Sequence, residues 1–108
     1  MKRGDIVTVS ASGDYGKPRP AIDMQSDWLD GTVSVLVALF TITLRDTPLF
    51  RLTVDPSPAT GLKVESQIMV DKIVALPRSK CGAVIGRLDD DTMLGLNRML
   101  SVVLGLAD

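Results

Sequence analysis

Residues 32–43, with the sequence TVSVLVALFTIT, decide the fold of this chain. The run consists almost entirely of β-branched and aliphatic residues. Turn-forming sequences bound it on both sides, with SDWLDG at 26–31 and LRDTP at 44–48. An apolar run of this length between turns is typical of a strand that is buried on both faces. We therefore predict a central strand on which the other elements pack.

Shorter strands are predicted on both sides of the central one. Their segments alternate apolar and polar side chains or are rich in strand-forming, β-branched residues. They cover residues 5–10, 19–25, 50–54, 66–76 and 83–88. Residues 66–76 are long enough for a pair of strands or for one bent strand. The connections 11–18 and 55–61 contain glycines or prolines, which interrupt a strand, and residues 77–82 predict a short helical turn.

The C-terminal segment 89–106 predicts a helix. Three aspartates at 89–91 favour the positive end of its dipole, and they point in different directions, so capping explains them better than a metal site does. Apolar residues cover almost the whole circumference, and such a helix must be buried. We therefore predict a homodimer to which this helix contributes. The predicted fold class is mostly β with a C-terminal helix, built on a strongly bent antiparallel sheet.

Length and composition indicate a single cytoplasmic domain that spans residues 1–108. The only cysteine, Cys81, excludes an internal disulfide, and no signal-type apolar segment follows the N-terminus. The apolar runs are much shorter than the ~20 residues that span a bilayer. The chain has no histidine, so it lacks the usual general base and the commonest metal ligand. Its net charge of −1 is uneven, with +2 on residues 1–87 and −3 on residues 88–108.

Several segments, taken in order, carry a resemblance to a known family. They are GDIV at 4–7, GKPRPAI at 16–22 with Gln25, Thr41, residues 66–73, and IGRL at 85–88. With this set the chain resembles the MazF/PemK/Kid toxins of type II toxin-antitoxin modules along nearly its whole length. The resemblance implies a small SH3-like barrel of antiparallel strands, of the CcdB/PemK type. It also implies a homodimeric, sequence-specific endoribonuclease without metal or other cofactor, whose partners are single-stranded RNA and a cognate antitoxin. The dimer interface that it implies includes strand edges as well as the C-terminal helix.

The resemblance further implies cleavage of single-stranded mRNA to a 2′,3′-cyclic phosphate and a 5′-OH, with Arg19 as the catalytic arginine. Arg19 precedes Pro20, which favours extended backbone at Arg19 and so directs its side chain. A guanidinium suits a phosphate whose negative charge grows during reaction. From the residues alone, a solvated arginine at a loop edge is the simpler interpretation.

Thr41 and Asp71 complete the implied catalytic set. The Thr41 hydroxyl is suited to a phosphate oxygen or to the ribose 2′-OH, although a threonine here is also a good strand former. Asp71 interrupts an apolar run and therefore requires a partner, a proton or an exposed edge. The resemblance makes it the candidate base for the 2′-OH, with a structural salt bridge as the alternative. Kid-like members carry an arginine two residues earlier, where this chain has Met69.

Other polar residues are candidates for a groove that binds RNA. They are Lys17, Gln25, Trp28, Thr43, Arg45 and Lys72, with Arg51 as a further cation. Trp28 is the only tryptophan available to stack on a base, unless it caps the core. Asp23 shares the strand alternation of Arg19, so it is expected either to pair with Arg19 or to occupy a tolerant edge.

Two other functions stay open at this point. A CcdB-like toxin that binds gyrase shares the fold, but its target contact needs a tryptophan near the C-terminus, and this chain ends in LGLAD. A catalytically weakened member that still binds an antitoxin is suggested by Asp23 and Met69. An RNA cleavage assay in the presence of EDTA separates the three functions.

Overall fold

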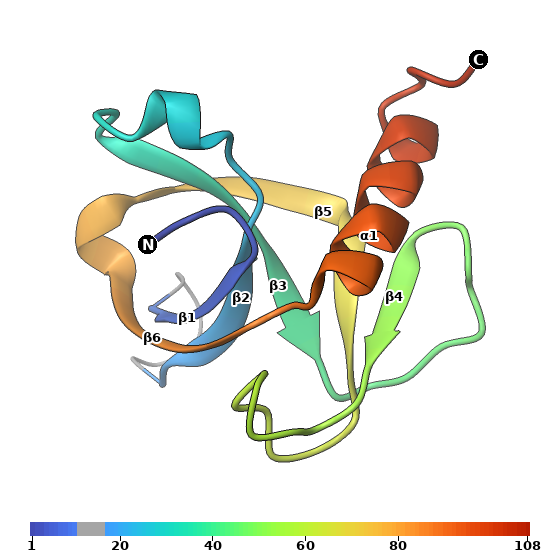
Figure 1. Cartoon of the computed structure of the whole chain (residues 1–108), viewed down its shortest axis with the longest axis horizontal. Coiled ribbons are helices and arrows are strands. Elements are labelled where there is room, and N and C mark those ends of the chain that lie inside the picture. The colour runs from blue at the N-terminus through green and yellow to red at the C-terminus, as the bar shows by residue number, and fades with distance from the viewer. Residues whose placement is uncertain (11–16) are drawn as a thin grey trace.

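The computed structural model describes residues 1–10 and 17–108. Strands in this part are β1 (Asp5–Val9), β2 (Arg19–Asp23), β3 (Ser34–Thr41), β4 (Arg51–Val54), β5 (Ser66–Pro77) and β6 (Cys81–Arg87). The helix α1 (Asp90–Val103) follows, and the short 3-10 helices η1 (Asp27–Leu29) and η2 (Arg78–Lys80) lie in the connections. Figure 1 shows α1, the last element of the chain, beside β5. The predicted class, mostly β with a C-terminal helix, is confirmed.

The strands form one antiparallel sheet in the order β4-β5-β3-β2-β1-β6. β3 lies inside it, between β5 and β2, as predicted for the apolar run. Neighbouring residues of a strand point to opposite faces, and here each face has its own core. Ile22 and Ala38 belong to a cluster that packs against α1, whereas Ala21 and Val37 belong to a second cluster beneath Leu76 and Cys81.

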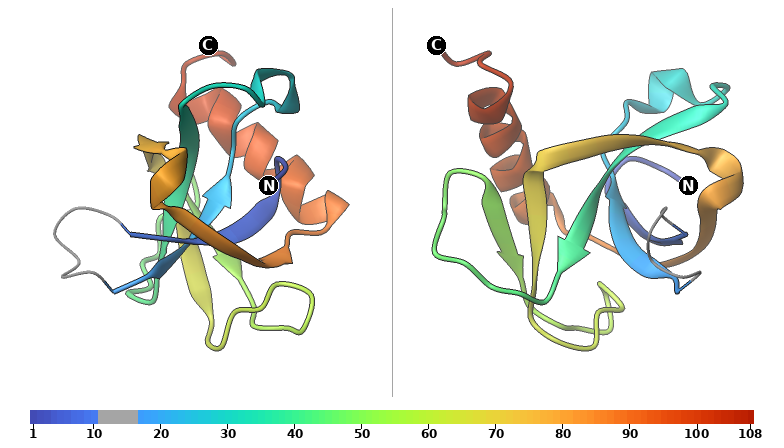
Figure 2. Two further views of the ribbon diagram at one scale, coloured as in Figure 1. Left: turned by 90° about the vertical axis from the view of Figure 1, so that its left-hand side faces the viewer. Right: turned by 180° about the vertical axis from the view of Figure 1, so that it is seen from behind.

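β5 is one bent strand, which decides between the two alternatives predicted for residues 66–76. Along β3, Ala38 pairs with Ile73 but Phe40 pairs with Ile68, so extra residues of β5 bulge out between the two pairs. Such bulges bend a strand strongly. The first part of β5 therefore pairs with β4 as well, and the second part curves around the sheet toward η2 and β6 (Figure 2). The short helical turn predicted at 77–82 is confirmed by η2.

The sheet is not closed into a complete barrel, because β4 and β6 are its two edges. The loop after β4 covers the gap, and the backbone N–H of Arg87 donates to the carbonyl of Ala59 at 2.9 Å. Backbones meet closely here, since a Cβ at Gly86 would lie 2.1 Å from the carbonyl oxygen of Thr60. A loop thus takes the place of a closing strand pair.

The C-terminal helix begins as predicted and ends earlier. Asp89 is its N-cap and accepts the backbone N–H of Thr92 at 2.7 Å. Hydrogen bonds from the side chain and the backbone of Thr92 lower the pKa of Asp89. The helix stops at Val103 instead of Leu106, because Gly105 adopts a φ of +72° and the N–H of Leu106 turns back to the carbonyl of Ser101. No helix in the described ranges is long and apolar enough to cross a membrane.

Candidate functional site

A pocket of about 260 Å³ opens where β2 begins and β3 ends. Its walls come from both strands, from the segment after β3 and from the start of β5. They are formed by Arg19, Pro20, Phe40, Thr41, Ile42, Thr43 and Ser66. Arg19 and Thr41, predicted separately along the sequence, therefore line the same pocket.

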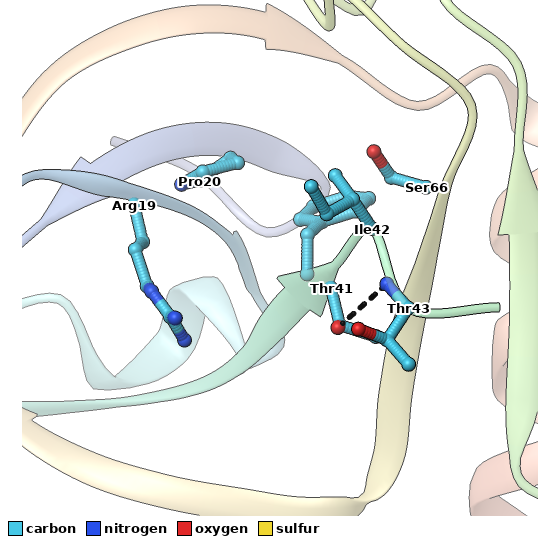
Figure 3. Close-up of a pocket in the computed structure, with 7 residues that line it drawn as sticks. Arg19, Pro20, Thr41, Ile42, Thr43 and Ser66 are labelled. Atoms are coloured by element: carbon cyan, nitrogen blue, oxygen red, sulfur yellow. Dashed lines mark hydrogen bonds between the residues drawn. The ribbon is translucent and has the colours of Figure 1, made fainter.

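The register between β2 and β3 explains why they meet. Ala21 pairs with Leu39 in this antiparallel ladder. The ladder has no pair beyond this one, but its register, continued two residues back along β2 and two forward along β3, would set Arg19 opposite Thr41. Residues that face one another across a ladder extend to the same side of the sheet, and Figure 3 shows both side chains on one side of the ribbon. The guanidinium of Arg19 is exposed, while Thr41 is half-buried.

The Thr41 hydroxyl has a defined role in the turn that leaves β3. Its Oγ1 accepts the backbone N–H of Thr43 at 3.1 Å, as the dashed line in Figure 3 shows. A hydroxyl that accepts this bond still has its own proton to donate. Thr43 is exposed and lines the pocket beside it, so the arrangement offers hydroxyl donors next to a cation.

Two buried polar side chains hold the segment that follows Thr43. The amide of Gln67 accepts the N–H of Arg45 at 3.0 Å and donates to the carbonyl of Arg45 at 3.0 Å. Arg51 donates from Nη1 to the carbonyl of Thr43 at 3.4 Å. Sequence reasoning missed Gln67, and it was wrong to place Arg51 in an exposed groove, because Arg51 is only 8% exposed. The alternation of FRLTV could not show that a loop covers this face.

Asp71 lies at the bend of β5 and does not line the pocket. The sequence predicted that this carboxylate has a partner, carries a proton or lies at an exposed edge. Its side chain is exposed, which agrees with the third alternative. No hydrogen bond or ion pair of Asp71 is formed within residues 1–10 and 17–108. Lys72, Lys17 and Arg45 are exposed as well, as an RNA-binding surface requires.

Gln25 and Trp28 follow β2 at the end of the sheet away from the pocket. β3 rises about 3.3 Å per residue, so roughly 20 Å of strand separates them from Thr41. Gln25 is buried and donates to the carbonyl of Leu29 and to Thr32 Oγ1, while its oxygen accepts the N–H of Leu36. This corrects the prediction that Gln25 presents its amide to RNA. Trp28 is 94% exposed on η1, so it does not cap the core.

Asp23 is buried at this far end and fits neither alternative predicted for it. It is 3% exposed, and its Oδ1 accepts the backbone N–H of Gln25 at 2.9 Å. Burial raises the pKa of this carboxyl, against the lowering effects of that hydrogen bond and of the Arg78 charge. Asp23 therefore helps to hold the backbone that leads into η1. Arg78 holds the residues after η1, because it donates to the carbonyls of Leu29 and Thr32.

Comparison with known proteins identifies the family. A family described as "PemK-like, MazF-like toxin of type II toxin-antitoxin system" matches residues 2–104. The chain belongs to this family. A MazF-like protein of Mycolicibacterium smegmatis, "Probable endoribonuclease MazF", is 46% identical over 108 residues, which cover 99% of each chain. The resemblance predicted from the sequence is thus confirmed.

Solved structures of MazF toxins share the fold. The Mycobacterium tuberculosis toxin MazF-mt6 superimposes with a TM-score of 0.80 at 22% identity, covering 94% of this chain and 96% of that one. A MazE–MazF structure from Deinococcus radiodurans gives a TM-score of 0.77 at 19% identity, covering 97% and 95%. At this level of identity the likeness concerns the fold alone.

The raised pKa of Asp23 predicts how the stability of this MazF-like toxin depends on pH. A carboxyl whose pKa is higher in the folded than in the unfolded state lowers the free energy of unfolding as pH rises. The loss begins near the unfolded-state pKa, about 3.9, and is complete above the folded-state pKa. Asp23→Asn removes the charge and keeps an oxygen for the Gln25 N–H. We expect its melting temperature to exceed that of the wild type by a few degrees at pH 7 and to converge with it below pH ~4. Equal melting temperatures at pH 7, measured by circular dichroism, would contradict this.

Proposed function

We propose that this protein is a toxin that cleaves single-stranded RNA at a short sequence motif by transesterification, without a metal ion. The proposal is carried by one observation, the convergence of Arg19 and Thr41 on a single pocket. Its support from outside the chain is the 46% identity to a probable endoribonuclease MazF. The site of action we propose is the cytoplasm.

In the proposed reaction the ribose 2′-oxygen attacks the adjacent phosphorus, and the bond from phosphorus to the 5′-oxygen breaks. The products are a 2′,3′-cyclic phosphate and a 5′-OH. Asp71 is the candidate that accepts the 2′-OH proton, while Arg19 stabilises the added negative charge and donates a hydrogen bond to the leaving 5′-oxygen, which takes its proton from water. Thr41 donates its hydroxyl proton to a phosphate oxygen. Asp71 can accept this proton only if the ribose next to the reacting phosphate lies between the pocket and the bend of β5.

The RNA path that fits the exposed cations runs from the pocket along neighbouring loops. Lys17 and Arg19 precede or begin β2, Arg45 follows Thr43, and Lys72 lies at the bend of β5. Each positive side chain near a phosphate adds affinity that decreases with salt. Trp28 would contact only a strand long enough to reach the opposite end of β2 and β3.

A cognate antitoxin is the proposed protein partner. One solved relative is an "Endoribonuclease in complex with its cognate antitoxin from Mycobacterial species", with a TM-score of 0.79 at 23% identity, covering 98% of this chain and 96% of that one. By analogy, we propose that an acidic antitoxin segment covers the exposed cations around Arg19 and so blocks RNA.

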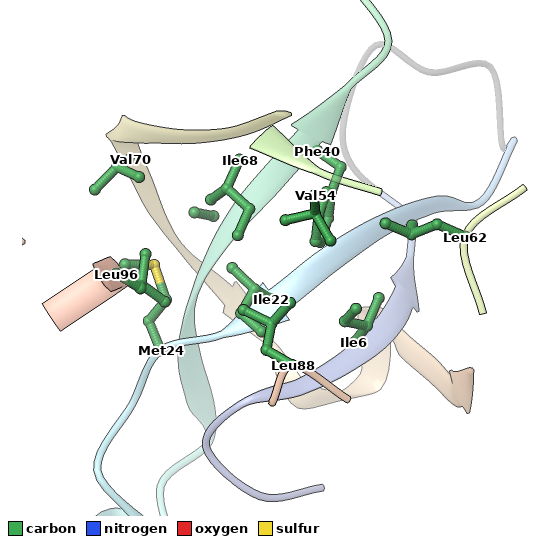
Figure 4. Packing of buried hydrophobic residues seen from close by; sticks show 11 residues of the cluster. Ile6, Ile22, Met24, Phe40, Val54, Leu62, Ile68, Val70, Leu88 and Leu96 are labelled. Atoms are coloured by element: carbon green, nitrogen blue, oxygen red, sulfur yellow. The ribbon is translucent and has the colours of Figure 1, made fainter. Parts of the chain in front are cut away.

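We also propose a homodimer that buries the outer side of α1. The inner side packs on the core, with Leu96 fully buried beside Met24 and Val70 (Figure 4). The outer side leaves Leu94 50% and Val102 46% exposed, and Leu104 and Leu106 after the helix are also exposed. One chain does not cover these side chains, and a second copy would.

The cleavage proposal predicts metal-independent activity that depends on Arg19. With EDTA present, the wild type should cut a mixed single-stranded RNA and leave cyclic-phosphate and 5′-OH ends. Arg19→Ala should lower the rate at least ~10²-fold, since it removes a charged donor from the transition state. Lys2→Ala, which removes an exposed cation outside the pocket and outside α1, serves as the control. Cleavage that Arg19→Ala leaves undiminished would refute the site, and an inactive wild type that binds antitoxin would favour a weakened family member.

The dimer proposal predicts that a charge on the outer side of α1 separates the protomers. Leu94→Glu should sediment as a folded monomer at concentrations where the wild type is a dimer, because the glutamate would be buried without a partner. Val33→Glu, an exposed position before β3, should stay dimeric. A wild type that is monomeric at tens of micromolar, or a dimeric Leu94→Glu, would rule out this interface.

A further inference from the structure

Arg51 is the most unusual buried group outside the pocket. It is 8% exposed and begins β4, where it pairs across the ladder with Met69 of β5. Its Nε has no hydrogen-bond partner, and no carboxylate among residues 1–10 and 17–108 forms an ion pair with it. A buried cation without an anion is expensive, and an apolar side chain of similar volume often serves stability as well or better. Stability therefore does not explain Arg51.

The hydrogen bonds around Arg51 lead directly to the pocket. Arg51 Nη1 donates to the carbonyl of Thr43, and the N–H of the same Thr43 donates to Thr41 Oγ1. Thr43 is thus held at both its carbonyl and its N–H. Because Thr41 Oγ1 already accepts one bond, its proton is the part left to donate toward the pocket. The orientation of the Thr41 hydroxyl depends on where Thr43 lies, and Arg51 helps to fix that position.

We propose that Arg51 is a positioning residue for RNA cleavage, which holds Thr43 and through it directs the Thr41 hydroxyl. This inference rests on the proposed function of the pocket. Arg51 itself does not line the pocket, and its action is indirect. Its effect should therefore fall on the chemical step more than on RNA binding. Gln67, which clamps both backbone groups of Arg45, holds the next part of the same loop.

The test compares Arg51→Met with Arg51→Lys in the full-length toxin. Methionine keeps a long apolar stem without charge, and lysine keeps a cation that can donate to the Thr43 carbonyl. For Arg51→Met we expect kcat to fall about tenfold with KM changed less than about twofold. Its melting temperature should equal or exceed that of the wild type. Arg51→Lys should recover most of kcat. Lys2→Met, which removes an exposed cation outside the pocket and outside α1, should leave kcat and the melting temperature unchanged.

Two results would overturn the proposal. One is an Arg51→Met variant with kcat within twofold of the wild type. The other is a melting temperature that falls by several degrees in both variants together with kcat, which indicates a merely structural role. Backbone amide NMR shifts of Thr41 and Thr43 provide a readout that needs no ribonuclease activity. If the wild type does not cut RNA, the proposed function fails. The proposal that Arg51 positions Thr43 and Thr41 then holds only if these shifts change in Arg51→Met and return to the wild-type values in Arg51→Lys.

Discussion

The antiparallel register between β2 and β3 is the constraint on which the rest of this structure depends. Pairing Ala21 with Leu39 and Asp23 with Val37 fixes which side chains share a face along both strands. A slip by one residue would send Ala21 and Val37 out of one core cluster and Ile22 and Ala38 out of the other. Because both faces are buried, the cores enforce the register. This register sets the start of β2 beside the end of β3, where Arg19 and Thr41 line one pocket, so the pocket follows from how the core packs.

The two ends of this strand pair carry different kinds of polar residue. At the end where β2 begins, exposed Arg19 and Thr43 and half-buried Thr41 face a pocket. At the other end, Asp23 and Gln25 are buried, and their side chains bond to backbone groups of the η1 turn and of β3. Groups available to a substrate therefore gather at one end, while those at the other end hold a turn. The loop after β3 is held by buried polar side chains as well. Arg51 donates to Thr43, which lines the pocket, and Gln67 bonds to Arg45 further along the same loop.

Periodicity in the sequence predicted most of the fold, and it failed where a distant segment covers a residue. Alternation, β-branched residues or a bounded apolar run located each strand, and the aspartates at 89–91 located the helix start, because these signals are local. The position of the β5 bend and the open seam beside Gly86 depend on how strands meet in space, which alternation does not encode. Gln25 was predicted to bind RNA because it belongs to the resembling motifs, and Arg51 because it is a cation. Their partners, Leu29, Leu36 and Thr43, come close only through turns in the folded chain.

The central claim, that Arg19 and Thr41 act on one phosphate in one pocket, is tested most directly by a double-mutant cycle. Cleavage rates of a defined single-stranded RNA are measured for the wild type, Arg19→Ala, Thr41→Val and the double variant. Residues that act together on one transition state have strongly non-additive effects. The account predicts that adding Thr41→Val to Arg19→Ala slows cleavage far less than Thr41→Val slows the wild type. Two effects that multiply independently would contradict it.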